Sequence, residues 1–412
     1  MDTGHATAIA LLITGVLVVL ANVVKVGLER LRVPALVGYI LLGLLVRVLD
    51  EQTGALSGHG RELLHFLGKL GVIALLFRVG LESNVSGLLR QLRSASVIWI
   101  GSVGVAGALG YWAAQLWLDL GVVPSLVIGV AMTATSVGIP TLVWRDLGAL
   151  DTRQGERFLD VAEMDDISGV ALLALLFSVL PLLLETTRDA ADAAGIMGTL
   201  LQQTGLFSLK LAALGVGAWV FSRWLEAPFI RSICRLESAP DPMLVVAGTG
   251  IAFAAVTALL GFSVAIGAFI AGLAFSRDPR ADQVLNSFRP LYELLTPFFF
   301  VSAGLMLAPS ALAAAAGSGA VLLSAAVVGK FLGTALPARA YGRTRDAVVL
   351  GVSMIPRAEI TMLIVQKAHA AGPDVLGRTA YASMVMVCAV TCLIGPLVLR
   401  WLLDRPGVVD TP

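Results

Sequence analysis

The stretch VAEMDDISGVALLALLF (Val161–Phe177) joins three carboxylates to an apolar helical segment. Glu163, Asp165 and Asp166 lie within four residues, and the second half of the stretch is as apolar as lipid. A charge in the hydrocarbon core costs several kcal/mol unless it is paired or hydrated. Neighbouring carboxylates there would bind protons as a coupled set, or a cation in their place. These residues therefore predict a site where protons and a metal cation exclude each other.

A lysine is expected at the same depth as the aspartates. At about 1.5 Å per helical residue, Asp165 and Asp166 lie roughly 12–14 Å from Arg157. Lys330 lies roughly 13 Å before Arg339, so all three share the middle of a core about 30 Å thick. A purely structural ion pair would explain one aspartate with the lysine. It would leave the second aspartate as an excess negative charge.

Composition indicates that these charges lie in a membrane protein. The chain has 412 residues, of which 57% are hydrophobic and only 14% are charged, and its mean hydropathy is +0.88. A soluble protein of this length needs a more charged surface. The formal net charge of +1 gives no sign of a nucleic-acid partner, and the four histidines are scattered. Cys388 and Cys392 lie in an apolar segment, where packing is the expected role.

Long apolar segments predict an all-α polytopic membrane protein, a single integral unit over 1–412 with no soluble domain. About 20 apolar residues cross a bilayer. We place about thirteen spans at 6–25, 34–49, 62–81, 96–118, 122–144, 157–183, 198–222, 242–260, 262–276, 290–308, 312–336, 346–368 and 377–402. Most of the 29 lysines and arginines then fall on one side. The positive-inside rule predicts an outside N-terminus and a cytoplasmic C-terminus.

Two spans carry related sequences at a constant offset of 222. VIGVAMTATSVGIPTLV (Val127–Val143) and VLGVSMIPRAEITMLIV (Val349–Val365) share Gly-Val-x-Met before a polar interruption. The interrupting residues are Thr133, Thr135, Ser136 and Gly138 in the first copy, and Pro356, Arg357 and Glu359 in the second. Spans five and twelve are an odd number of crossings apart, so the copies are inverted. Unless the similarity is chance, inverted repeats with broken helices indicate a secondary transporter with a site at the repeat interface.

Several motifs resemble those of one transporter family along nearly the whole chain. They are PALVGYILLGLL (Pro34–Leu45), LGVIALLFRVGLE (Leu70–Glu82), TATSVGI (Thr133–Ile139), the Asp165–Asp166 pair, GAFIAGL (Gly267–Leu273), TPFFFVSAGL (Thr296–Leu305), GKFLG (Gly329–Gly333) and MIPRAE (Met354–Glu359). The chain resembles a bacterial sodium/proton antiporter of the monovalent cation:proton antiporter-2 family. That resemblance implies an inverted-repeat antiporter fold in which spans five and twelve are crossed and discontinuous.

The resemblance also implies a homodimer, in which an ion-translocating core moves like an elevator against a scaffold. The core would lie mainly in 62–183 and 290–370, and the remaining spans would form the scaffold and dimer domain. The bilayer of the bacterial inner membrane and small cations are then the partners, with no cofactor. An aspartate pair with a lysine resembles the electrogenic members, since electroneutral relatives commonly have Asn before the ion-binding Asp.

The family's site residues map onto this sequence by motif. Asp166 would be the main ligand of the transported cation, and Asp165 would form an ion pair with Lys330 that breaks on cation binding. The resemblance places Thr135 and Ser136 at the first crossover. It places Glu359 and Arg357 at or near the second.

Charged residues depart from the family pattern at three positions, Asp160, Glu163 and Arg78. Glu163 stands where relatives are small or apolar, and would either add a ligand or extend a polar funnel toward the cytoplasm. Arg78 also replaces an apolar residue, and we expect it to pair with Glu82 or with Glu163.

The sequence therefore predicts a monovalent cation/proton antiporter, not an enzyme. Na⁺ is the expected ion, with Li⁺ or K⁺ as alternatives. A K⁺/H⁺ antiporter or potassium efflux protein is a second reading, although efflux relatives usually append a cytoplasmic nucleotide-binding domain. An organic-anion symporter on the same fold and a sensory or structural membrane protein are further alternatives. Buried negative charge favours small cations.

Overall fold

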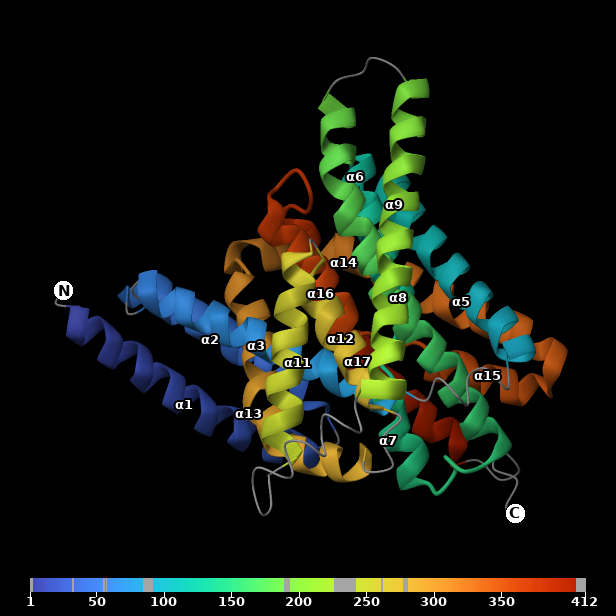
Figure 1. Cartoon of the computed structure of the whole chain (residues 1–412), viewed down its shortest axis with the longest axis horizontal. Helices are drawn as coiled ribbons and strands as arrows, with labels where there is room; N and C mark the ends of the chain where they lie inside the picture. The colour runs from blue at the N-terminus through green and yellow to red at the C-terminus, as the bar shows by residue number, and fades with distance from the viewer. Residues whose placement is uncertain are drawn as a thin grey trace. The chain divides into compact units, whose positions relative to one another are not determined.

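The computed structural model is all-helical in the residues that it describes, with no β-strand among them. These residues are 3–31, 33–54, 56, 58–83, 92–188, 193–225, 242–260, 262–276 and 281–404. The helices that coincide with the predicted uninterrupted spans are α1 (Thr3–Arg30), α2 (Ala35–Thr53), α3 (Gly58–Glu82), α5 (Leu92–Trp112), α8 (Arg153–Arg188), α9 (Ala193–Val220), α11 (Pro242–Leu259), α12 (Val264–Phe275), α13 (Ala281–Met306), α14 (Pro309–Ala338) and α17 (Arg378–Leu403) (Figure 1).

The length and hydropathy of these helices are those of an integral membrane protein. Within the described ranges, seven helical segments are long and apolar enough to cross a bilayer. Shorter apolar helices occupy Thr204–Val220, Ala247–Leu259 and Val264–Phe275. The count of thirteen spans and the direction of the termini stay predictions.

Two predicted spans are interrupted helices. The first consists of α6 (Val122–Thr133) and α7 (Gly138–Asp146), and the second of α15 (Thr344–Ser353) and α16 (Glu359–Ala371). The breaks fall at the polar residues of the repeat, as predicted. In the second copy Pro356 cannot donate a helical hydrogen bond, and it disfavours helix at the residue before it. The first copy breaks at a run of Thr and Ser, which are weak helix formers.

The chain divides into two compact units. Unit 1 contains Met1–His65, Val85–Gly169 and Phe300–Pro412, and unit 2 contains Phe66–Asn84 and Val170–Phe299. Both interrupted helices lie in unit 1. The division into a core at 62–183 and 290–370 and a scaffold stays a prediction.

Inside unit 1, α14 packs closely on α5 because glycines face each other. A Cβ atom at Gly333 would lie 2.5 Å from the carbonyl oxygen of Gly101, and one at Gly101 would lie 2.6 Å from that of Gly333. A Cβ at Gly329 would lie 3.0 Å from the Cα of Ala106. Small residues allow such close approach of membrane helices. The backbones of α5 and α14 are therefore in close contact at Gly329 and at Gly333, which lie before and after Lys330 in α14.

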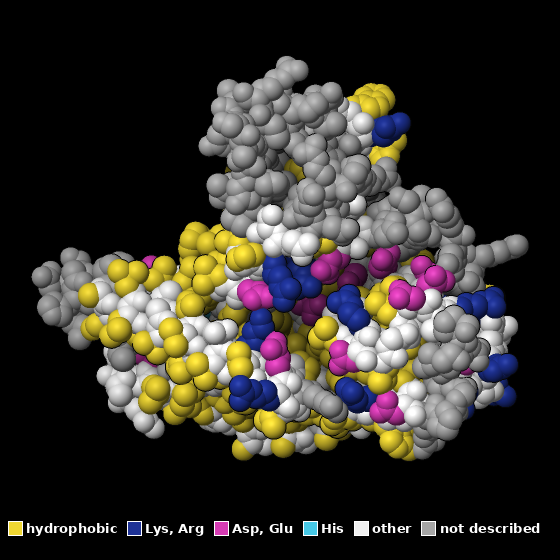
Figure 2. Space-filling view, turned by 90° about the horizontal axis from the view of Figure 1, so that it is seen from below, with side chains coloured by type: hydrophobic (Ala, Val, Ile, Leu, Met, Phe, Trp, Pro, Cys, Tyr) yellow, Lys and Arg dark blue, Asp and Glu magenta, His cyan; other side chains and the backbone are white. Residues whose placement is uncertain are grey.

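Polar contacts also join helix ends in unit 1. Gln154 donates to Asp346 over 2.8 Å, and Arg400 lies 3.7 Å from Asp146. Acidic and basic side chains adjoin one another on the face shown in Figure 2, with apolar side chains around them.

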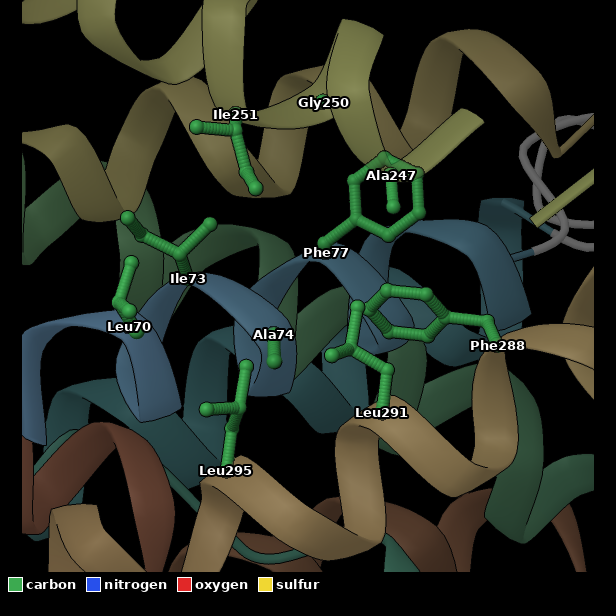
Figure 3. A pocket seen from close by; sticks show the side chains of 10 residues that line it. All are labelled: Leu70, Ile73, Ala74, Phe77, Ala247, Gly250, Ile251, Phe288, Leu291 and Leu295. Carbon is green, nitrogen blue, oxygen red and sulfur yellow. The ribbon is translucent and has the colours of Figure 1, made fainter. Parts of the chain in front are cut away.

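Unit 2 contains an apolar crevice between α3, α11 and α13 (Figure 3). Phe77 of α3 packs against Phe288 of α13, with ring centroids 5.2 Å apart. A Cβ atom at Gly250 of α11 would lie 2.8 Å from the Phe77 ring, so a larger residue there would force the ring to shift. The crevice is lined by apolar residues alone and has no chemistry for an ion.

Candidate functional site

A fully buried ion pair joins α8 to α14. The Nζ atom of Lys330 donates to both carboxylate oxygens of Asp165 over 2.8 Å each, and neither side chain is exposed to solvent. The sequence resemblance implied this pair. Since burying two charges is costly, good geometry and a complete set of hydrogen bonds are needed to hold them.

Ser102 of α5 completes the surroundings of the lysine. Its Oγ atom accepts the third hydrogen bond of Lys330 over 3.0 Å, and it too is fully buried. Next to it, Trp99 donates to Ser168 over 2.9 Å, and Ser168 donates to the carbonyl oxygen of Asp165 over the same distance. Helix α5 therefore supports both partners of the ion pair.

Asp166 is buried beside this pair, with 6% of its surface exposed. Three residues further along α8, Gly169 faces the two breaks: a Cβ atom there would lie 3.3 Å from the side chains of both Ala134 and Ile360. Glu163 lies one turn before Asp166 and is half-buried. The missing side chain at Gly169 lets the acidic segment of α8 approach the irregular backbone closely.

The two breaks bind each other through backbone and hydroxyl groups. The backbone N–H of Ser136 donates to the carbonyl oxygen of Pro356 over 2.8 Å. The Thr135 hydroxyl donates to Met354 over 3.2 Å, and the Thr361 hydroxyl donates to Ala131 over 2.9 Å. Backbone groups freed from a helix inside a membrane must find such partners. The copies of the repeat therefore meet at their interruptions.

Glu359 lies at the start of α16 and contacts the other break. The Ser136 hydroxyl donates to its Oε2 atom over 3.1 Å. A carboxylate at a helix N-terminus is stabilised by the unpaired N–H groups and the helix dipole. The negative charge of Glu359 thus lies where the backbone of α16 favours it.

Arg357 is fully buried and binds carbonyl groups. One terminal nitrogen donates to the carbonyl oxygens of Met132, over 2.5 Å, and Ala134, over 2.9 Å. The other donates to Ala326 of α14 over 3.0 Å. The guanidinium group therefore caps the carbonyl end of α6, where positive charge is favourable.

Helix α17 holds the backbone of Arg357. The backbone N–H of Arg357 donates to the Thr391 hydroxyl over 3.3 Å, and the carbonyl oxygen of Arg357 accepts from the Cys392 thiol over 3.0 Å. Cys388 and Cys392 are free, buried thiols, as the sequence indicated. The second break is thus fixed from α6, α14 and α17.

Eight of the nine predicted site residues lie in unit 1, either in the two breaks or on α8, α14 and α16. They are Thr135, Ser136, Glu163, Asp165, Asp166, Lys330, Arg357 and Glu359. Arg78 lies in unit 2, where it binds Glu82 over 2.8 Å and lies 4.4 Å from the centroid of the Tyr292 ring. Both members of that pair are more than a third exposed.

A cation here would take oxygen ligands of several kinds. In the described parts of the chain, no group of three or more His, Cys, Asp or Glu side chains is placed to hold a metal ion. Hydroxyl or backbone oxygens would therefore have to complete the coordination of a cation held by the aspartates. Irregular backbone in broken membrane helices supplies such oxygens in transporters.

Sequence reasoning missed Ser102, Thr361 and Thr391. Each is a single hydroxyl residue in an apolar segment, and such residues commonly bond to their own helix. The one available signal was spatial: each lies on a helix that packs against a break or against Lys330.

An all-helical membrane fold with paired buried charges beside two broken helices has the architecture of a secondary transporter. The transmembrane domain of the sodium/hydrogen exchanger family matches residues 14–405. The chain therefore belongs to the sodium/hydrogen exchanger family, whose members are cation/proton antiporters and not enzymes.

Relatives with assigned activities cover most of the chain. The Na⁺/H⁺ antiporter of Enterococcus hirae is 27% identical over 90% of this chain and 92% of its own. The Na⁺/H⁺-K⁺ antiporter GerN of Bacillus cereus is 27% identical over 90% of each chain. The high-affinity Na⁺/H⁺ antiporter NhaS3 of Synechocystis is 26% identical over 85% of this chain and 74% of its own.

A solved structure has the same fold. The sodium proton antiporter MjNhaP1 from Methanocaldococcus jannaschii superposes with a TM-score of 0.69 at 16% identity, covering 97% of this chain and all of that one. At this identity the likeness shows the fold alone.

Proposed function

We propose that the protein exchanges Na⁺ for H⁺ across a bacterial inner membrane. The observation that carries this proposal is the Asp165–Lys330 pair, fully buried next to Asp166 on the helix that approaches both breaks. One carboxylate is neutralised by the lysine, and the other adds negative charge beside irregular backbone. Such a centre requires a proton or a metal cation.

Asp166 is the principal cation ligand in this proposal. When Na⁺ binds, Asp165 releases Lys330 and joins the coordination, and protons held by the group leave. Thr135 and Ser136 supply further oxygens from the first break. Because the aspartates cannot hold protons and Na⁺ together, each species is exchanged for the other. The proposed exchange is electrogenic, which requires more than one proton to leave for each Na⁺ that binds.

Arg357 and Glu359 are the charge compensators of the two half-helix ends. In this scheme the interrupted helices cross, and they move with Lys330 and the aspartates as part of a core at 62–183 and 290–370. That core slides like an elevator against a scaffold that forms a homodimer. The N-terminus lies outside and the C-terminus in the cytoplasm, so Glu163 lies on the cytoplasmic approach to Asp166.

K⁺ is the second candidate ion. The Bacillus cereus relative is named for both Na⁺ and K⁺, and KhtU of Bacillus subtilis, 26% identical over 95% of this chain, is named as a subunit of a K⁺/H⁺ antiporter. Proton exchange driven by Na⁺ and by K⁺, compared across a pH series, decides between them.

Purified protein in liposomes tests the function. A Na⁺ gradient should produce a pH gradient, and Asp166→Asn should abolish it because the neutral amide removes the ligand charge. Glu82→Gln is the control, since this half-exposed carboxylate pairs with Arg78 in unit 2. Sodium-driven exchange at the wild-type rate by Asp166→Asn would overturn the assignment.

A further inference from the structure

The three donors of the Lys330 ammonium group are all in use. Two bind Asp165 and the third binds Ser102. In the proposed cycle Asp165 turns to the cation, which removes two acceptors from a charge that has no exposed surface. A buried ammonium group without acceptors is strongly unfavourable. The released state therefore depends on the acceptors that remain.

Ser102 is the acceptor that does not take part in ion binding. It comes from α5, a different helix from the aspartates, and directly follows Gly101 at the contact with Gly333 of α14. This tight contact fixes the distance between Ser102 and the lysine backbone. The hydrogen bond to Ser102 can persist when Asp165 leaves, because neither α5 nor α14 has to move.

A second hydroxyl lies one turn beyond the lysine. Thr334 is fully buried, and its Oγ1 atom has no hydrogen-bond partner. Helical Ser and Thr usually donate to the carbonyl four residues earlier, as Ser353 does to Val349 in this chain. Thr334 does not do so with Lys330. Residues four apart share a helix face, so Thr334 lies on the same face of α14 as Lys330, and its hydroxyl is unpaired.

We infer that Ser102 is a positioning residue that retains the Lys330 ammonium group when Asp165 binds the cation, with Thr334 as the second acceptor. This inference rests on the proposed function, in which the lysine is released. It assigns α5 a part in transport: α5 stabilises the cation-bound state by holding the displaced charge.

The test is sodium-driven proton exchange by Ser102→Ala in liposomes. While Lys330 is paired with Asp165, Ser102 supplies one of its three acceptors. After Asp165 has turned to the cation, Ser102 is the main acceptor. Loss of the Ser102 hydroxyl should therefore weaken Na⁺ binding more than it weakens the Asp165–Lys330 pair. We expect the KM for Na⁺ to rise about tenfold, as for loss of one hydrogen bond to a charged group, with kcat nearly unchanged. Thr334→Val should raise the KM for Na⁺ about twofold. The double variant should raise this KM by more than the product of the two single increases.

The control is Ser383→Ala. This fully buried serine on α17 forms a hydroxyl pair with Ser318 over 2.7 Å, away from the lysine. Its KM should stay at the wild-type value. If Ser102→Ala cannot be purified, Ser102→Cys, which keeps the size but is a weak acceptor, should show an intermediate KM.

The possible results separate this inference from the function beneath it. A fall in kcat with unchanged KM in the Ser102 variants would mean a structural role and would overturn the inference. An unchanged KM in the double variant would do the same while leaving sodium exchange intact. A wild-type protein that exchanges no Na⁺ would overturn the proposed function itself.

Discussion

Two fully buried cations lie in unit 1, and their surroundings differ. Lys330 binds a carboxylate and a hydroxyl, which are side chains that can rotate away. Arg357 binds three backbone carbonyls, on α6, in the first break and on α14, and its own backbone is held by α17. Carbonyl partners move only if a helix moves. We infer from this difference that Arg357 stabilises the fold around the two breaks, as a framework residue, whereas Lys330 takes part in ion exchange.

The residue types fit this division. A guanidinium group is planar and presents several fixed donors, so it can bind diverging carbonyls at one time. An ammonium group is a compact charge on a flexible stem, and it changes partners easily. Exchanging the two residue types should therefore harm the two regions in different ways.

Arg357→Lys should have the largest effect on the fold. The lysine would keep the charge but lose at least two of the three bonds to Met132, Ala134 and Ala326. We expect a loss of about 4 kcal/mol in the free energy of unfolding, from two charge-assisted hydrogen bonds and the acceptors left unsatisfied. Thermal unfolding in detergent measures it, with Arg289→Lys, whose side chain is 71% exposed, as the control. Unaltered stability would show that the guanidinium group is not framework.

Lys330→Gln should change transport more than stability. The amide still reaches Ser102 or Asp165, and Asp165 can take up a proton, so we expect a loss of only about 1–2 kcal/mol. Exchange should become less sensitive to membrane potential because the charge that changes partners is gone. Currents from liposomes at set potentials measure this. A voltage response equal to that of the wild type would remove the lysine from the charge-moving step.

Arg78→Gln should have the smallest effect. The Arg78–Glu82 pair is one helical turn long and more than a third exposed, and such pairs contribute little. We expect the KM for Na⁺ to change by less than about twofold. A larger change, found by the same liposome assay, would make this arginine part of the ion pathway and would show that Lys330 is not the only cation that works in transport.

Much of this arrangement was predictable because it follows from the cost of charge in lipid. Asp165, Asp166 and Lys330 stand out in apolar segments, and equal depth suggested that they meet. The repeat predicted both interruptions, since Pro356 and the Thr-Ser run oppose helix formation at matching places. These signals are local in sequence or follow from counting residues along a helix.

The partners of Arg357 and Lys330 were not predictable in this way. Backbone carbonyls exist at every residue, so nothing in the sequence marks Met132 or Ala326 as acceptors. Ser102 resembles any hydroxyl in an apolar helix until the Gly101–Gly333 contact places it beside the lysine. Which side chain completes a buried charge depends on how helices distant in sequence cross.

The Arg357 charge has a consequence for the valence of the transported ion. Counted with both breaks, the centre holds three carboxylates (Asp165, Asp166 and Glu359) against Lys330 and Arg357. With all five ionised it carries one net negative charge, which a single alkali metal ion neutralises. A divalent ion would leave a surplus positive charge in a poorly hydrated space. Electroneutrality thus disfavours Mg²⁺ and Ca²⁺ before ionic radius has any part in selection.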